Sequence, residues 1–190
     1  MTKNIAIIPV RIGSKRLPRK NIKEFNGRPI FLYSLDCAVN SGLFDEIHVS
    51  TESSEVAEIC EEAGFVPKFM RPNDLAKDDA TLEQVCEHTI NEYKKNSLNF
   101  ENFCLIWATS PMMLPKDISN AYNLLSDADA VVSTCEYDFP FFSGHELFEN
   151  NEIKPYFPHL LHGNIKRPTV VCVNSSFCWV KIDKFLNFHK

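Results

Sequence analysis

The stretch IAIIPVRIGSKRLPRKN, residues 5–21, joins a short apolar run to a strongly basic segment. Residues 5–10 are apolar throughout, which is typical of a buried parallel strand. Residues 11–21 then carry several cations and no acidic side chain. In an open α/β sheet, ligands bind beyond the carboxyl ends of the strands. The stretch therefore predicts a first strand that leads into an anion-binding loop.

The basic loop offers several kinds of group that bind phosphate. Gly13 lets the backbone approach a ligand closely, and neighbouring N–H groups can point at an anion. Ser14 adds a hydroxyl donor, while Arg11 and Lys15 add charge-assisted hydrogen bonds. The spacing is neither that of a Walker A loop nor GxGxxG. A solvated basic loop with weak surface ion pairs is the alternative interpretation.

The rest of the chain is acidic. Its 190 residues carry a formal net charge of −5 and are 44% hydrophobic, an ordinary globular composition. An acidic protein is not expected to bind nucleic acid generally, so the local cations indicate a local anionic ligand. No apolar run approaches the roughly 18 residues of a membrane span, and no signal peptide is recognisable. Seven scattered cysteines without a CxxC pair predict reduced thiols in a cytoplasmic protein.

Strand and helix patterns alternate beyond the loop. Further strands are predicted at residues 46–51, 67–72, 103–110 and 129–137, and helices at 30–41, 53–63, 81–93 and 116–125. This order is typical of right-handed βαβ units, which form a mostly parallel sheet covered by helices on both faces. Two short returning strands are predicted at 169–173 and 176–182, before a last helix from residue 183.

Residues 137–168 break the alternation, because they are dense in proline, aromatic residues and histidine. Such a segment is too apolar for a free linker and is expected to pack on the domain or on a partner chain. We therefore expect residues 1–136 and 169–190 to form one nucleotide-binding α/β domain. Residues 137–168 are expected to form an extension.

A long ordered signature resembles the acylneuraminate cytidylyltransferases, the CMP-sialic acid synthetase family that includes enzymes for pseudaminic and legionaminic acid. The resemblance rests on IIPVRIGSKRLPRKNIKEFNGRPI, SGLFDEIHVSTESSEVAEICEEAG, RPNDLAKDDAT and ATSP, within residues 4–136. It implies a three-layer Rossmann-like nucleotidyltransferase fold. It also implies that CMP passes from CTP to a nonulosonic sugar such as N-acetylneuraminate or pseudaminic acid, with Mg²⁺ as cofactor and pyrophosphate as product.

The resemblance also implies roles for individual residues. Lys20 and Arg11 would be the catalytic residues that hold the triphosphate. The nucleotide-binding set would be Arg11, Gly13, Ser14, Lys15, Asn21, Arg71, Ala80 and Thr81. Leu82 departs from the pattern, since some relatives have a serine there that helps read the base, and Thr81 is its candidate substitute. A loop-closing salt bridge is the alternative role for Arg71.

For the sugar, the resemblance implies contacts from Trp107, Thr109, Ser110, Arg167, Asn174 and Ser175. Trp107 stands where sialic acid enzymes often have glutamine, which weakly favours a variant sugar such as pseudaminic acid; a core position is the alternative. Asn174 and Ser175 match a small-residue turn. The segment 137–168 resembles the family's extension to a second subunit, which implies a homodimer.

The metal ligands are not identified by the sequence. Relatives continue into an acidic SIDIDT-like stretch that holds Mg²⁺, and these 190 residues contain no such motif. The alternative function is therefore a truncated family member that binds CTP but is catalytically weak or inactive. A ketodeoxyoctulosonate-type enzyme is disfavoured, because those enzymes usually have an acidic strand end where this chain has ATSP.

Overall fold

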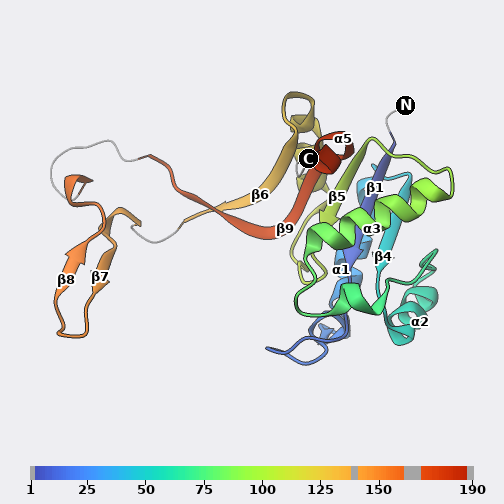
Figure 1. Cartoon of the computed structure of the whole chain (residues 1–190), viewed down its shortest axis with the longest axis horizontal. Helices are drawn as coiled ribbons and strands as arrows, with labels where there is room; N and C mark the ends of the chain where they lie inside the picture. Colours follow the sequence, from blue (N-terminus) through green and yellow to red (C-terminus); the bar gives the residue numbers. More distant parts are fainter. Residues whose placement is uncertain (1–2, 138–140, 161–167, 188–190) are drawn as a thin grey trace. The chain divides into compact units, whose positions relative to one another are not determined.

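The computed structural model describes residues 3–137, 141–160 and 168–187 (Figure 1). Its strands are β1 (Asn4–Pro9), β2 (Glu24–Phe25), β3 (Arg28–Pro29), β4 (Glu46–Ser50), β5 (Asn102–Ile106), β6 (Ala130–Glu136), β7 (His145–Leu147), β8 (Ile153–Pro155) and β9 (Val171–Lys181). The α-helices are α1 (Phe31–Ser41), α2 (Ser54–Glu62), α3 (Leu82–Lys95), α4 (Pro115–Leu124) and α5 (Ile182–Asn187). Short 3-10 helices are η1 (Lys20–Ile22), η2 (Asn73–Ala76), η3 (Leu125–Asp127), η4 (Phe141–Ser143) and η5 (Pro158–Leu160).

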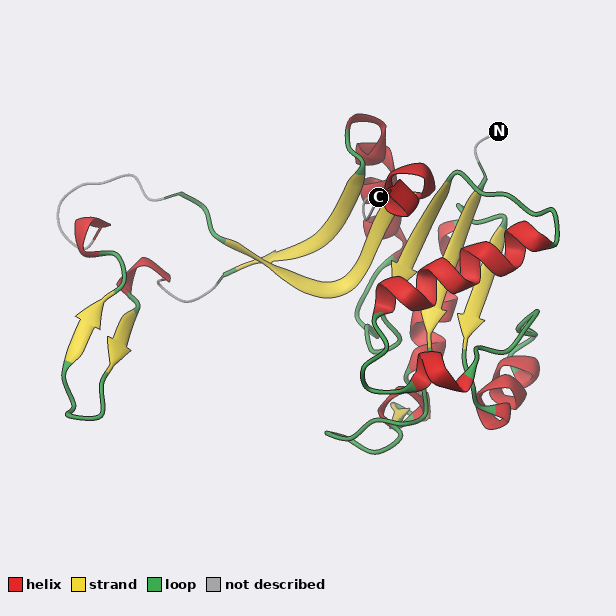
Figure 2. Cartoon of the chain, viewed as in Figure 1, coloured by secondary structure: helices red, strands yellow, loops and turns green. Residues whose placement is uncertain are grey.

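The chain divides into two compact units. The first comprises Met1–Ser133 and Ser175–Lys190, and the second comprises Thr134–Asn174. The boundaries expected from the sequence, after residue 136 and before residue 169, fall inside the second unit. Within that unit, β7 and β8 form a separate two-stranded antiparallel sheet (Figure 2).

The main sheet has five strands in the order β4-β1-β5-β9-β6. β1 pairs in parallel with β4 on one side and β5 on the other, whereas β9 runs antiparallel to β5. A central strand flanked by parallel neighbours is buried on both faces, which explains why residues 5–10 read as a continuous apolar run. The predicted α/β class with a mostly parallel sheet is confirmed.

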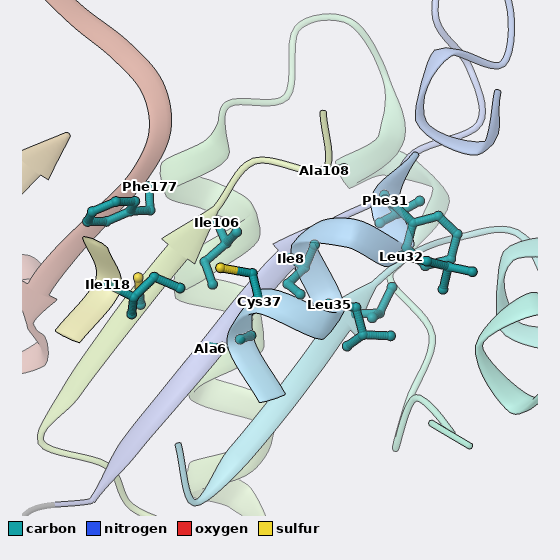
Figure 3. Packing of buried hydrophobic residues seen from close by; sticks show 14 of the residues in the cluster. Ala6, Ile8, Phe31, Leu32, Leu35, Cys37, Ile106, Ala108, Ile118 and Phe177 are labelled. Atoms are coloured by element: carbon teal, nitrogen blue, oxygen red, sulfur yellow. The ribbon is translucent and has the colours of Figure 1, made fainter. Parts of the chain in front are cut away.

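Alternate residues of β1 face two separate cores. Ala6 and Ile8 pack with the apolar faces of α1 and α4 (Figure 3). Ile5 and Ile7 point the other way and pack with side chains of α3 and α5, and Figure 1 shows α3 lying across the strands. The period of two in strand side chains thus distributes one apolar run between two helical layers, which gives the three-layer architecture.

Two strand predictions are wrong. Residues 67–72 form no strand in the structure, because Pro67 and Pro72 lack the N–H groups that a ladder needs. Residues 169–173 and 176–182 were predicted as separate strands, but Val171–Lys181 is one strand. Ser175 inside it has φ 53°, a left-handed conformation, and the N–H groups of Ser176 and Phe177 both donate to Ser133 Oγ. The expected turn at Asn174 and Ser175 is therefore a local irregularity within a strand.

Four of the seven cysteines, Cys37, Cys60, Cys86 and Cys104, are buried as separate thiols. Burial raises the pKa of Cys37 and Cys60 to about 11 each, so both stay protonated and unreactive. Across the described residues, no helix is long and apolar enough to cross a bilayer.

His48 is a buried titratable group beneath α3. The ring is 1% exposed and stacks on Phe69 with centroids 4.3 Å apart. Tyr93 donates its hydroxyl hydrogen to Glu46 Oε1 at 3.1 Å, so His48 Nδ1, 3.2 Å from that hydroxyl oxygen, is the donor in their contact. Burial, with His88, Lys68 and Arg71 adding like charge, lowers the pKa of His48 from 6.5 to about 3.

This lowered pKa predicts sensitivity to acid. Below pH 6.5 His48 becomes protonated in the unfolded chain. In the native protein it stays neutral down to about pH 3. The free energy of unfolding should therefore fall by about 1.4 kcal/mol per pH unit across this window from His48 alone. We expect His48→Gln to flatten that slope in urea unfolding between pH 7 and 4, whereas His159→Gln, at an exposed position, should not. Equal slopes for wild type and His48→Gln would contradict the assignment.

Candidate functional site

A cavity of about 240 Å³ lies at the carboxyl ends of β1 and β5. Its lining includes Pro9, which ends β1, and Trp107, which follows β5. The predicted site residues that line it are Arg11, Lys20, Asn21, Arg71, Ala80, Thr81, Trp107 and Thr109. Two separate segments of the sequence thus supply cations to one cavity, at the sheet edge where ligands of open α/β sheets bind.

A larger cavity of about 450 Å³ lies near Asn102, at the other end of β5. Two cations, Lys94 and Lys181, and two carboxylates, Glu101 and Asp183, are among its lining residues. It contains none of the predicted site residues. The smaller cavity, where cations predominate, is therefore the better candidate for an anionic ligand.

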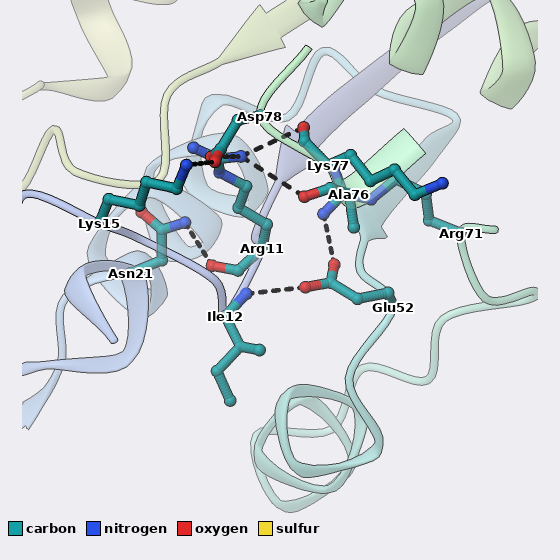
Figure 4. Close-up of polar contacts among 9 residues, drawn as sticks. All are labelled: Arg11, Ile12, Lys15, Asn21, Glu52, Arg71, Ala76, Lys77 and Asp78. Carbon is teal, nitrogen blue, oxygen red and sulfur yellow. Dashed lines mark hydrogen bonds and ion pairs between the residues drawn. The ribbon is translucent and has the colours of Figure 1, made fainter. Parts of the chain in front are cut away.

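The start of the basic loop is held by Asp78 (Figure 4). Arg11 Nη1 lies 3.1 Å from Asp78 Oδ1, and Lys15 Nζ lies 2.5 Å from Asp78 Oδ2. The same Arg11 nitrogen donates to the carbonyl oxygens of Ala76 and Lys77 at 3.4 and 3.3 Å. Hydrogen bonds from Lys15 and, secondarily, Arg11 hold the pKa of Asp78 below its ordinary value. Arg11 and Lys15 therefore already clamp one anionic group.

The end of the basic loop is fixed by Asn21, whose buried side chain donates from Nδ2 to the carbonyl oxygen of Arg11 at 2.9 Å. This bond closes the loop upon itself, so that Lys20, the first residue of η1, faces the same cavity as Arg11. Among the described residues Lys20 has no ion-pair partner. It is thus the cation of the cavity that remains available to a ligand without displacing a carboxylate.

Arg71 is a buried cation, 4% exposed. Its Nη2 lies 2.5 Å from Glu52 Oε2, and its backbone N–H donates to the carbonyl oxygen of Thr51 at 2.7 Å. Its Nε is buried without a partner among the described residues. The salt bridge, the alternative role for Arg71, is therefore present, and Arg71 also lines the cavity, where its contact with the base stays a prediction.

Thr81 caps the amino terminus of α3. Its Oγ1 accepts from the N–H of Gln84 at 3.3 Å, and Gln84 Oε1 accepts from the N–H of Thr81 at 2.9 Å. The N–H of Ala80 donates to the carbonyl oxygen of Lys77. The backbone donors of Ala80 and Thr81 are therefore engaged within the chain, which leaves the hydroxyl hydrogen of Thr81 as a donor for a ligand.

Trp107 serves the cavity and the core together. Its side chain lines the cavity and packs against the core beneath α3. Its backbone is fixed on both sides, since the N–H donates to the carbonyl oxygen of Ser176 at 3.0 Å and the carbonyl accepts from Ser34 Oγ at 2.8 Å. The two interpretations from the sequence are thus compatible.

Several predicted site residues do not line the cavity. Gly13 and Ser14 belong to the basic loop, and Lys15 reaches only the cavity residue Asp78. Ser110 lies just beyond the lining residue Thr109. The others are Asn174 and Ser175, which lie in β9 and are exposed, and Arg167, which lies outside the described residues.

Sequence reasoning missed two carboxylates of the site, Glu52 and Asp78. Glu52 follows β4 by two residues, so the rule that ligand groups follow strand ends pointed to it. Asp78 lies within RPNDLAKDDAT, but nothing in that string distinguishes it from Asp74 or Asp79. Only the fold shows which of these carboxylates meets Arg11 and Lys15.

The three-layer fold thus presents a cationic cavity at the sheet edge where ligands of open α/β sheets bind. The chain belongs to the cytidylyltransferase family, whose sequence profile matches residues 5–157. Pseudaminic acid cytidylyltransferase of Campylobacter jejuni is 33% identical over 153 residues, which cover 80% of this chain and 66% of the relative. N-acylneuraminate cytidylyltransferase of Streptococcus agalactiae is 38% identical over 140 residues, covering 72% and 33%. The chain thus spans at most about two thirds of these relatives.

Among solved structures, CMP:2-keto-3-deoxy-manno-octonic acid synthetase complexed with CTP superposes with a TM-score of 0.75. The match covers 99% of this chain and 78% of the other, at 15% sequence identity. At that identity the likeness establishes the fold alone. It agrees with the order of strands and helices described above.

Proposed function

We propose that the protein transfers CMP from CTP to a nonulosonic, sialic-acid-like sugar and releases pyrophosphate. The observation that carries this proposal is the cavity in which Arg11, Lys20 and Arg71 converge. The names of the relatives, a pseudaminic acid and an N-acylneuraminate cytidylyltransferase, support the substrate class. Clustered cations suit a reaction in which positioning and charge neutralisation provide most of the catalysis.

In the proposed reaction, the anomeric hydroxyl oxygen of the sugar attacks the α-phosphorus of CTP. A bond from that oxygen to phosphorus forms, the bond to the bridging oxygen of pyrophosphate breaks, and the hydroxyl proton is released. Negative charge increases on the departing pyrophosphate, and Lys20 would neutralise it. Arg11 and Lys15 would exchange the Asp78 carboxylate for phosphate oxygens, which are the same kind of anionic acceptor. Arg71 would contact the cytosine.

In this proposal, Mg²⁺ enters only as an ion bound to the phosphates of CTP. Among the described residues, no group of three or more histidine, cysteine or acidic side chains could hold a metal ion. Asp78 is the single carboxylate among the described residues that line the cavity, and it pairs with Arg11 and Lys15 in the absence of nucleotide. These residues do not fit a protein-bound magnesium centre, and Mg²⁺ commonly rests on substrate phosphates and water.

For the sugar, we propose contacts from Trp107 and Thr109, which line the cavity beside the nucleotide residues. Pseudaminic acid is the preferred candidate, because Trp107 stands where sialic acid enzymes often have glutamine. We also infer a cytoplasmic location from the separate buried thiols, since secreted proteins of this size usually pair their cysteines.

The test is pyrophosphate release with CTP, Mg²⁺ and a panel of nonulosonates. We expect turnover with pseudaminic acid or N-acetylneuraminate and none when CTP is replaced by ATP. Binding of CTP without turnover on any sugar would support the alternative of a catalytically weak family member. No binding of CTP at all would overturn both.

We further propose that the second unit mediates homodimer formation. Leu147 and Ile153 pair across β7 and β8, and their side chains are 70% and 65% exposed. Tyr156 is also largely exposed in this unit. Contiguous exposed apolar side chains mark interaction surfaces.

This proposal predicts a dimer at micromolar concentration in light scattering. The double substitution Leu147→Asp and Ile153→Asp should convert the dimer to a monomer. In the dimer, the new carboxylates of the two protomers would be buried in the interface without cationic partners, which is strongly unfavourable. The control, Glu149→Gln in the exposed β7–β8 connection, should remain dimeric. A wild-type monomer at this concentration would contradict the proposal.

A further inference from the structure

Glu52 lies at the junction of three segments of the site, and Figure 4 shows its carboxylate between two partners. One oxygen, Oε1, accepts from the N–H of Ile12, in the basic loop, at 2.9 Å. The other, Oε2, lies 2.5 Å from Arg71 Nη2. Glu52 itself follows β4, which pairs with β1 in a continuous parallel register. One carboxylate therefore joins the phosphate-facing loop to the residue proposed to read the base.

The surroundings make this link rigid. The carbonyl oxygen of Thr51 accepts from the N–H of Arg71, so backbone and side chain of Arg71 are both fixed by adjacent residues of one segment. The carbonyl oxygen of Ser50 accepts from the N–H of Val10 at 2.8 Å, immediately before the basic loop. The basic loop and Arg71 are thus both hydrogen-bonded to residues 50–52, at the end of β4.

Burial sets this pair apart from the other ion pairs of the chain. The side chains of Arg71 and Glu52 are 2% and 11% exposed, whereas Arg19 and Glu55, the matching surface pair, are 56% and 43% exposed. A charge-assisted hydrogen bond shielded from water holds its geometry far better than an exposed one. Arg71 is consequently oriented before any nucleotide arrives, which reduces the ordering cost of binding.

We propose that Glu52 is a positioning residue for nucleotide recognition, which holds Arg71 and the start of the basic loop in register so that base and triphosphate are bound together. This inference rests on the proposed function, since it assumes that the cavity takes a cytidine nucleotide. Glu52 does not line the cavity itself. It acts through Arg71 and through the N–H of Ile12.

The test is calorimetric binding of CTP and UTP to the full chain, without sugar. Glu52→Gln keeps an oxygen for the N–H of Ile12 but loses the charge that holds Arg71. We expect it to weaken CTP binding at least about tenfold and to narrow the preference for CTP over UTP, because a misplaced Arg71 no longer distinguishes the bases. Glu55→Gln, on the surface pair, should change the dissociation constant by less than about twofold.

Two further variants separate positioning from simple stability. Glu52→Asp keeps the charge with a shorter reach and should restore part of the affinity; it also provides a test if Glu52→Gln does not fold. In an Arg71→Gln background, Glu52→Gln should weaken CTP binding far less than it does alone, because the two act as a unit. A lowered melting temperature with unchanged affinity and unchanged preference for CTP would overturn the proposal. If the wild-type chain binds neither CTP nor UTP, the proposed function itself fails, which is a different result.

Discussion

Lys20→Ala should lower the kcat for CMP-sugar formation by a factor on the order of 10²–10³, which amounts to loss of measurable product in an ordinary assay. Lys20 lines the cavity without an ion-pair partner among the described residues. Its charge is therefore free to act where negative charge develops as pyrophosphate leaves. The measurement is pyrophosphate release at saturating CTP and sugar, with circular dichroism to show that the fold is intact.

Lys23→Ala is the matched control for this substitution. Lys23 lies three residues after Lys20, just beyond the basic loop, but it is exposed and does not line the cavity. The two variants remove the same charge from nearly the same place in the sequence. If the two substitutions lower kcat equally, the effect comes from the summed positive charge in this part of the chain and not from the position of Lys20. If Lys20→Ala turns over near the wild-type rate, Lys20 has no role in the chemistry.

Arg11 should behave differently from Lys20, for a reason visible in its contacts. It holds the Asp78 carboxylate and two carbonyl oxygens in the absence of nucleotide. Binding a triphosphate exchanges one anionic partner for another, so the net gain at Arg11 is smaller than its charge suggests. The local contacts therefore predict a smaller loss of activity on removing Arg11 than on removing Lys20, although the sequence presents the two cations as equivalent.

The sequence was most informative where one local pattern decides the structure. The apolar run of residues 5–10 predicts β1, because a strand with parallel neighbours on both sides must be apolar on both faces. The same reasoning was wrong for residues 67–72. There, four residues between two prolines have the local composition of a strand, but the prolines themselves offer no N–H group to a sheet partner.

The candidate site was predictable in its cations, whereas the partners of its carboxylates were not predictable. Lys20 and Arg11 stand out because several cations without an acidic neighbour are unusual in an acidic chain. Glu52 and Asp78 lie 40 and 67 residues from their partners Ile12 and Arg11. Such long-range contacts depend on the order of strands in the sheet, which no local pattern encodes. No local pattern marks the boundaries of the second unit either, because β6 and β9 each continue across one of them.

Trp179→Ala should be the most destabilising single substitution in the core, with a loss of about 3–5 kcal/mol in the free energy of unfolding. Trp179 is 0% exposed, and its Nε1 donates to the carbonyl oxygen of Ile118 in α4 at 3.1 Å. Its ring stacks on Phe44 and packs against Tyr122, with centroids 5.1 and 4.9 Å away. The substitution removes the side chain that joins β9 to α4 and leaves a large cavity.

Urea unfolding followed by circular dichroism is the suitable measurement, because tryptophan fluorescence changes with the substitution itself. Trp179→Phe keeps a ring in the cluster but loses the hydrogen bond to Ile118, and should cost clearly less than Trp179→Ala. Trp107→Phe, at the half-buried tryptophan of the cavity, should cost less still while weakening sugar use. A large loss of stability for Trp179→Ala, beside a small loss of stability and weaker sugar use for Trp107→Phe, is the informative result. It separates the tryptophan that stabilises the fold from the tryptophan of the site. Equal destabilisation by Trp179→Ala and Trp107→Phe would mean that β9 and α4 are held together by other contacts.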